Sequence, residues 1–109
     1  MAIQYLENEI INGKLSISVI TAIELIQGAG NKIDQRRAKE LIKKFNIVYI
    51  SKEISKKAFS LMSVHHLAYS LEMADSLIAA SAIYYKTELV TRNIKDYRFI
   101  SGLNIKSPY

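Results

Sequence analysis

The chain has 109 residues, of which 50% are hydrophobic and 23% are charged, and its formal net charge is +5. This length supports one compact core and is too short for two, so we expect a single domain over residues 1–109. The absence of cysteine excludes a disulfide framework and a thiolate metal site. No apolar run approaches the roughly 18 residues of a membrane span, and no secretion signal is apparent. We therefore expect a soluble cytoplasmic protein without a membrane partner.

The excess of positive charge is concentrated in residues 32–44 (KIDQRRAKELIKK) and 52–57. Such an excess attracts polyanions over long range. The simpler interpretation is that these lysines and arginines lie on solvated helix faces. Binding to a nucleic acid or to an acidic protein segment is the alternative.

The first predicted element is a short amphipathic helix over residues 2–12, where apolar side chains recur at helical spacing and Gly13 supplies a stop. A run rich in β-branched residues then predicts a strand over 15–20. Thr21 is expected to cap the helix that follows. That helix is expected to end at Gly28.

The rest of the chain continues to alternate between helix and strand. The remaining predicted elements are a helix over 34–45 with Asp34 as its cap, a strand over 46–50, a helix from Ser51, a helix over 74–86, a strand over 88–91, a turn over 93–99 and an edge strand over 103–106. The helix over 74–86 is almost entirely apolar and must be buried on most sides. This alternation predicts an open α/β sheet with mostly parallel strands, in which ligands bind beyond the carboxyl ends of the strands.

Three carboxylates stand in apolar segments at junctions between strands and helices: Glu24 in ISVITAIELIQGA, Asp75 in ADSLIAASAIYY and Asp96 in LVTRNIKDY. A lone buried charge is costly unless something pairs with it. Carboxylates about 4 Å apart repel by roughly 4 kcal/mol per pair at an effective dielectric constant of 20. Such a cluster stays ionised only with a cation between its members. The three acids therefore suggest a divalent-metal site.

Each acid also has a structural interpretation. Glu24 could simply be exposed on its helix. Asp75 could be a helix-start residue, where the macrodipole favours negative charge, and Asp96 could be a surface turn residue. The aromatic side chains near these segments are interpreted as core or interface rather than as platforms for stacked bases: Tyr84, Tyr85, Tyr97 and Phe99.

The three acidic segments, in this order and with these spacings, resemble those of PIN-domain ribonucleases, most closely the toxin of bacterial VapBC-type toxin–antitoxin pairs. The resemblance extends from about Ile3 to Ile105. It implies a PIN-like three-layer α/β/α fold with a mostly parallel sheet. It also implies a metal-dependent endoribonuclease that uses Mg²⁺ or Mn²⁺ to cleave RNA such as tRNA, with a cognate VapB-like antitoxin as its partner.

The resemblance also implies a role for each candidate catalytic residue. Glu24, Asp75 and Asp96 would be metal ligands, either directly or through water. Asn93 would position water or phosphate. The metal would activate water for attack on a phosphodiester and stabilise the leaving oxygen.

The chain departs from the family pattern at its start, because members of the family open with a central strand that carries an aspartate. Without that strand, backbone groups on both neighbouring strands would lose partners, at ~1–3 kcal/mol for each buried group. We expect the gap to be closed by re-pairing of the remaining strands, by a strand or helix exchanged within a homodimer, or by another polypeptide. Metal binding should weaken without the first acid. The alternative function is a catalytically dead module that associates with itself or binds an antitoxin.

Overall fold

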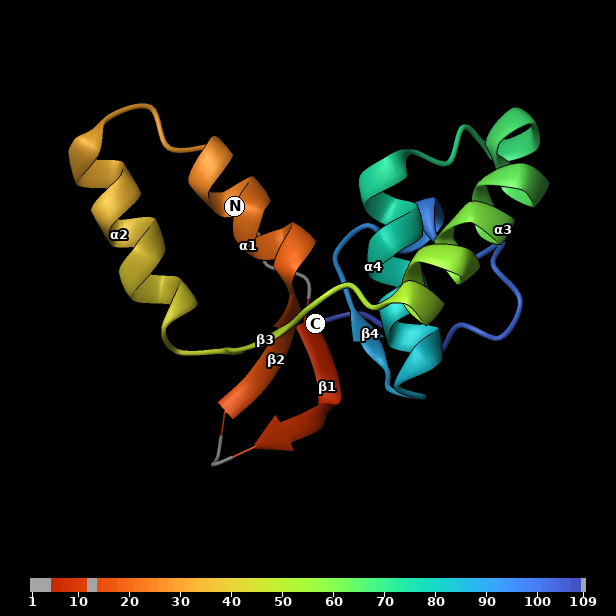
Figure 1. Ribbon diagram of the computed structural model, residues 1–109, viewed down its shortest axis with the longest axis horizontal. Coiled ribbons are helices and arrows are strands. Elements are labelled where there is room, and N and C mark those ends of the chain that lie inside the picture. Colours follow the sequence, from red (N-terminus) through yellow and green to blue (C-terminus); the bar gives the residue numbers. More distant parts are fainter. Residues whose placement is uncertain (1–4, 12–13, 109) are drawn as a thin grey trace.

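The computed structural model describes residues 5–11 and 14–108, which form one five-stranded sheet and two pairs of α-helices (Figure 1). The strands are β1 (Tyr5–Ile11), β2 (Lys14–Ser18), β3 (Asn46–Val48), β4 (Leu89–Val90) and β5 (Ile105–Lys106). The helices are α1 (Val19–Gln27), α2 (Lys32–Ile42), α3 (Lys52–Tyr69), α4 (Met73–Tyr84) and the short 3-10 helix η1 (Ile94–Asp96). The strand order is β3-β2-β1-β4-β5. None of the helices within these ranges combines the length and the apolar composition of a membrane-spanning segment.

The centre of the sheet is formed by β1, in a stretch where apolar spacing predicted a helix. That prediction is wrong for residues 5–11, whereas residues 2–4 and 12 lie outside the described part. Leu6 lies opposite Ser16 of β2 on one side and opposite Leu89 of β4 on the other. A helix this short is marginal on its own, so pairing on both sides decides the conformation. The central position is thus filled from within the chain, which agrees with the expected re-pairing of strands.

The sheet is mixed. Its outer pairings, β2 with β3 and β4 with β5, are parallel, while β1 is antiparallel to both of its neighbours. The α/β class is therefore confirmed, but the expected predominance of parallel pairing is not found in the described strands. Only residues 12–13 separate β1 from β2. A connection this short permits only an antiparallel hairpin, because a parallel crossover needs a dozen or more residues.

Side-chain caps fix where the helices begin. Ser18 accepts a hydrogen bond from the backbone of the first turn of α1, so this helix starts directly at the end of β2 and not at Thr21. Asn31, and not Asp34, caps α2, because its Oδ1 accepts from the Asp34 backbone N–H at 2.8 Å. Ser51 caps α3, because its hydroxyl oxygen accepts a hydrogen bond from the Ile54 backbone N–H. Each Ser or Asn cap satisfies a backbone donor that the helix itself leaves unpaired.

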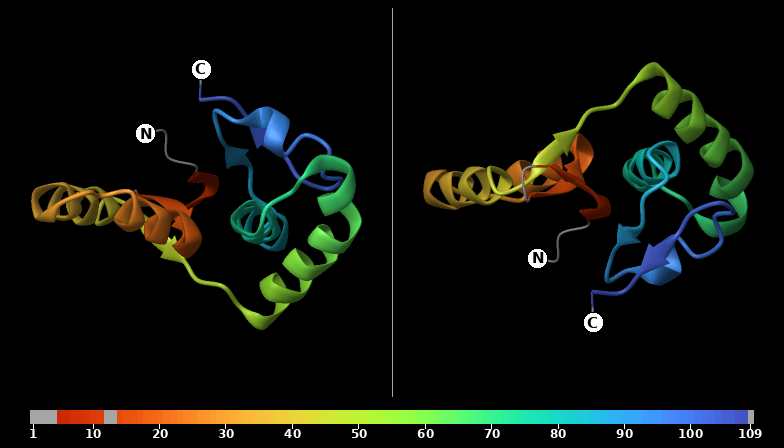
Figure 2. Two further views of the ribbon diagram at one scale, coloured as in Figure 1. Left: turned by 90° about the horizontal axis from the view of Figure 1, so that it is seen from above. Right: turned by 90° about the horizontal axis from the view of Figure 1, so that it is seen from below.

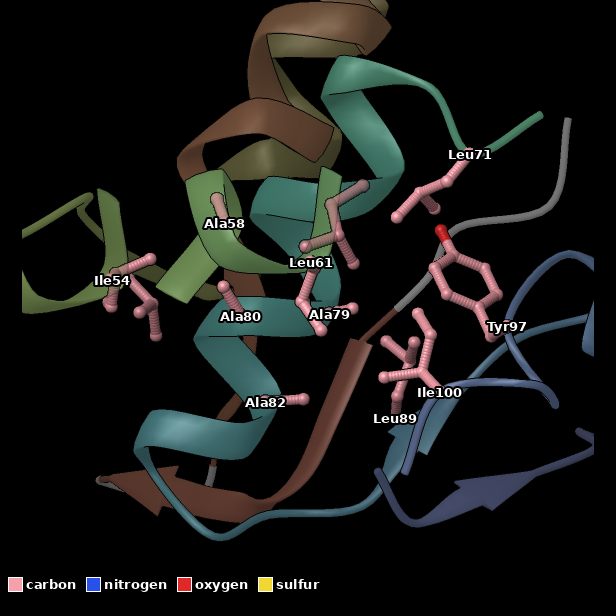
Figure 3. Close-up of a cluster of buried hydrophobic side chains, with 12 residues drawn as sticks. Ile54, Ala58, Leu61, Leu71, Ala79, Ala80, Ala82, Leu89, Tyr97 and Ile100 are labelled. Atoms are coloured by element: carbon pink, nitrogen blue, oxygen red, sulfur yellow. The ribbon is translucent and has the colours of Figure 1, made fainter. Parts of the chain in front are cut away.

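The helices are arranged as two packed pairs, α1 with α2 and α3 with α4, on opposite sides of β1 and β2 (Figures 1 and 2). The predicted burial of the apolar helix is confirmed, since α4 supplies much of the core. Its small side chains allow α3 to approach closely. Figure 3 shows this core, which includes Ile54, Ala58 and Leu61 of α3, Ala79, Ala80 and Ala82 of α4, and Leu71, Leu89, Tyr97 and Ile100 from the segments around them.

Candidate metal centre

Two of the three predicted acids line the same pocket. Asp75 lies in the first turn of α4, and Asp96 is the last residue of η1. The pocket has a volume of about 310 Å³ and is lined by Tyr69, Ser70, Leu71, Glu72, Asp75, Lys95, Asp96 and Phe99. Glu24 lies outside this lining, on α1, which packs against α4. In the described structure, Asp75 and Asp96 therefore line one pocket, and Glu24 lies on a helix that packs against α4.

A buried tyrosine orients Asp75. The hydroxyl group of Tyr97 donates a hydrogen bond to Asp75 Oδ1 at 3.0 Å, and the Tyr97 ring is fully buried in the core. This bond ties the turn after β4 to the start of α4. The sequence identified Tyr97 only as a core or interface residue. Its polar role was missed because the two residues are 22 positions apart, and no local pattern reports such a contact.

The acids influence one another electrostatically. Burial raises the pKa of Asp75, and the negative charges of Asp96 and Glu72 raise it further, while the hydrogen bond from Tyr97 acts in the opposite direction. Glu24 is exposed, and its partial desolvation raises its pKa less decisively, with a second contribution in the same direction from the charge of Asp75. Desolvation and neighbouring negative charge both disfavour the ionised carboxylate. Asp75 is therefore electrostatically coupled to one carboxylate on α1 and to another on η1.

These raised pKa values predict how the stability of the metal-free protein depends on pH. The folded protein holds protons that the unfolded chain has already released, so the free energy of unfolding should fall as pH rises above about 4. Asp75 and Glu24 contribute their full stabilisation at pH values below their pKa values in the unfolded chain. This stabilisation is lost as the pH rises through their higher pKa values in the folded protein. Urea unfolding between pH 4 and 7 measures this. Asp75→Asn should show a shallower fall, and MgCl₂ should oppose the fall in the wild type alone. Equal slopes in both proteins would contradict the coupling.

The donor chemistry suits a hydrated magnesium ion. Within residues 5–11 and 14–108, no three Asp, Glu or His side chains come close enough to surround an ion by themselves. Mg²⁺ prefers oxygen ligands, retains several waters and often takes only one or two protein carboxylates. Asp75, with Glu24 and Asp96 near enough to affect the charged state of the site, fits such an ion. The same residues do not fit an ion enclosed entirely by protein ligands.

The structure shows a backbone role for Asn93. Its backbone N–H donates to Thr91 Oγ1 at 3.0 Å, and its carbonyl accepts from the Asp96 backbone at the same distance. Its side chain is exposed and is not among the described residues that line the pocket. Asn93 thus shapes the turn that presents Asp96, while its contact with water or phosphate stays a prediction.

The comparisons with known proteins agree with this fold. The family model for the PIN domain matches residues 2–100. The chain therefore belongs to the PIN domain family, and the PIN-like α/β architecture implied by the resemblance is confirmed. Among curated protein sequences, none matches this chain.

Several solved structures are similar to the chain. One is a toxin–antitoxin complex from Klebsiella pneumoniae, with 34% identity and a TM-score of 0.68 over 86% of this chain and 73% of that chain. Another is VapBC-1 from nontypeable Haemophilus influenzae, with 25% identity and a TM-score of 0.76 over 92% and 78% of the two chains. DNA-bound VapBC from Salmonella typhimurium shares the fold, with 23% identity and a TM-score of 0.70 over 84% and 74%. The predicted resemblance to PIN proteins of the VapBC type is confirmed.

Proposed function

We propose that the chain is the VapC-like toxin of a toxin–antitoxin pair and that it acts as a metal-dependent endoribonuclease. The observation that carries this proposal is the electrostatic coupling of Glu24 and Asp96 to the half-buried Asp75. The three residues lie on elements far apart in sequence, and the half-buried Asp75 is the one whose charge its surroundings make costly, because Glu24 and Asp96 are exposed. Clustered carboxylates that are costly to ionise suit a divalent cation, and membership of the PIN domain family supports the same chemistry.

Each residue of the site has a proposed role. Asp75 is the principal ligand, because Tyr97 orients its carboxylate and its position is half-buried. Glu24 and Asp96 hold waters of the ion or complete its shell. When bound, Mg²⁺ or Mn²⁺ supplies Lewis-acid stabilisation of the phosphodiester and lowers the pKa of an attacking water. The Lys95 ammonium group, in the wall of the pocket, offsets negative charge on the substrate backbone.

The direct test is cleavage of purified tRNA and of unstructured RNA by the metal-free protein after addition of Mg²⁺ or Mn²⁺. We expect cleavage with either ion, its loss on addition of EDTA, and recovery when Mg²⁺ is added in excess. Intact RNA in every condition would support the catalytically dead alternative. Cleavage that persists in EDTA would indicate a contaminating nuclease.

A separate apolar groove supports an antitoxin as the partner. It has a volume of about 590 Å³ and is lined by Ala22, Ile23, Ile26 and Gln27 of α1, Ile42 of α2 and Ile47 of β3. The exposed face of α2 adds positive charge through Lys32, Arg36 and Lys39. An apolar floor beside basic residues suits a segment with apolar and acidic side chains. Because Glu24 lies on the same helix, a segment bound there would lie near the acidic site.

Two exposed isoleucines provide a matched test of this groove. Ile23 lines the groove, whereas Ile33 is similarly exposed on α2 outside its lining. The chain should co-purify with the product of the gene next to its own and lose nuclease activity in the complex. We expect Ile23→Asp to prevent this association and Ile33→Asp to preserve it. If both variants bind equally well, the partner does not occupy this groove.

A further inference from the structure

Two aromatic rings lie stacked in the wall of the acidic pocket. Tyr69 is the last residue of α3, and Phe99 follows η1. Their ring centroids are 4.2 Å apart, and their planes differ by only 4°. Both residues line the pocket that contains Asp75 and Asp96. A flat aromatic surface thus stands beside the proposed site of phosphodiester cleavage.

The position of Tyr69 is fixed by the local backbone. The next residue, Ser70, adopts a left-handed conformation with φ 57°, and its N–H donates to the carbonyl of His66 at 2.7 Å. The Nδ1 atom of His66 in turn donates to the carbonyl of Leu71 at 2.8 Å. These bonds hold the end of α3 in one conformation. The Tyr69 ring itself is held by its stack on Phe99 and by the tilted ring of His65, whose centroid is 6.0 Å away.

The two rings differ in exposure, and this difference gives the stack an outer face. Phe99 is partly buried and packs against the core, and the ring of His65 supports it at 5.1 Å. Tyr69 is 57% exposed. Aromatic rings that are needed only for the core are normally covered, because their large apolar surface gains free energy on burial. The outer ring is available to a further flat group.

The charges around the stack indicate which flat group would bind. Lys95 lines the same pocket and suits a phosphate, and the acids suit a divalent cation that also binds phosphate. A ligand with a flat ring joined to a phosphate is a nucleotide. Stacking of a base on an aromatic side chain tolerates any base, because every base has a π-face.

We propose that Tyr69, backed by Phe99, holds an unpaired RNA base next to the phosphodiester that is cleaved. This inference rests on the proposed nuclease function and assigns it a residue that binds a base of the substrate. A base can reach Tyr69 only if it leaves its own helical stack. The base that Tyr69 holds should therefore be unpaired in the bound RNA.

The test compares Tyr69→Leu, which keeps apolar bulk but removes the flat ring, with Tyr69→Phe, which keeps the ring. Tyr49 is a matched control, because it is 66% exposed and lies outside the pocket. The measured quantity is kcat/KM for a short single-stranded RNA in Mg²⁺. We expect Tyr69→Leu to lower it by about 5- to 100-fold, and Tyr69→Phe and Tyr49→Leu to stay within about twofold of the wild type.

Substrates with a single abasic site distinguish stacking from a structural role. When the abasic site is moved along the RNA, one position should lower the activity of the wild type. At that position the abasic site should not lower the activity of Tyr69→Leu any further. If Tyr69→Leu matches Tyr49→Leu while the wild type cleaves RNA, the stacking subsite is refuted and the nuclease stands. If Tyr69→Leu is impaired equally on every substrate, its role is structural and the inference fails. Absence of metal-dependent cleavage in the wild type would remove the proposed function, and this inference with it.

Discussion

Asp75→Asn should lower the kcat/KM for RNA cleavage by more than about 100-fold. Replacing even a residue that only hydrogen-bonds to a metal ligand typically lowers metal affinity or activity by about 10- to 100-fold. Asp75 is the proposed principal ligand, so its replacement should have a larger effect. The neutral amide loses the charge that attracts the cation while keeping nearly the same shape. Mg²⁺ affinity, measured by calorimetry, should fall together with activity.

The interpretation of this variant depends on its remaining folded. The amide group introduced by Asp75→Asn would still offer an oxygen to the Tyr97 hydroxyl, and the substitution removes a charge that burial and two neighbouring acids disfavour. We therefore expect the metal-free variant to be at least as stable as the wild type at pH 7. Glu53→Gln is the matched control, because it removes an equal charge from an exposed position on α3. Unchanged activity in Asp75→Asn would refute the assigned ligand.

Leu6→Pro should destabilise the whole domain and weaken metal binding. Leu6 is paired with β2 on one side and β4 on the other, and proline cannot donate to either ladder. Each buried backbone group left unpaired costs about 1–3 kcal/mol, out of roughly 5–15 kcal/mol for a typical domain. β2 leads into the helix of Glu24, and β4 leads into the turn of Asp96. Disrupting β1 thus also loosens the acidic site.

Urea unfolding of Leu6→Pro and Leu6→Val provides the measurement. Valine favours a strand and keeps the backbone donor, so it should preserve most of the stability, whereas proline should lower the unfolding free energy by at least about 2 kcal/mol. Amide hydrogen exchange adds an independent check, because amides within a central strand should exchange slowly. Rapid exchange throughout residues 5–11, together with a harmless proline, would show that β1 is not the centre of the sheet.

The contrast between α4 and β1 shows what the sequence could predict about the fold. The apolar composition of α4 predicted burial on most sides, and the structure confirms it, because burial follows directly from side-chain chemistry. The seven residues of β1 are too few to separate a helical from an extended period. Their conformation is set by pairing with β4, which lies near the other end of the chain. Local spacing contains no information about such a partner.

The candidate site was predictable from the sequence to a similar extent. Isolated charges in apolar segments indicated Glu24, Asp75 and Asp96 as candidates. In the structure the charge of Asp75 raises the pKa of Glu24 and that of Asp96 raises the pKa of Asp75, while their role as metal ligands stays a prediction. Tyr97 and the stack of Tyr69 on Phe99 could not be found, because these contacts join separate elements. The aromatic residues were interpreted as core or interface, which is correct for the Tyr97 ring but leaves out its hydroxyl.

The sequence predicts a homodimer as one way to complete the sheet. Within the described residues, β1 fills the middle of the sheet, so a strand exchanged between subunits is not needed to complete it. The homodimer stays a prediction, as does tRNA as the substrate. The groove beside α1 supports an antitoxin independently of either.

Anomalous diffraction from a crystal soaked in MnCl₂ tests the acidic site most directly. We expect one manganese peak in the pocket between α4 and η1, with an Asp75 oxygen in direct contact and with Glu24 and Asp96 reached directly or through ordered water. The same soak of Asp75→Asn should show no peak there. An empty pocket in the wild type, or manganese bound elsewhere while these three side chains face separate surfaces, would contradict the proposed metal centre.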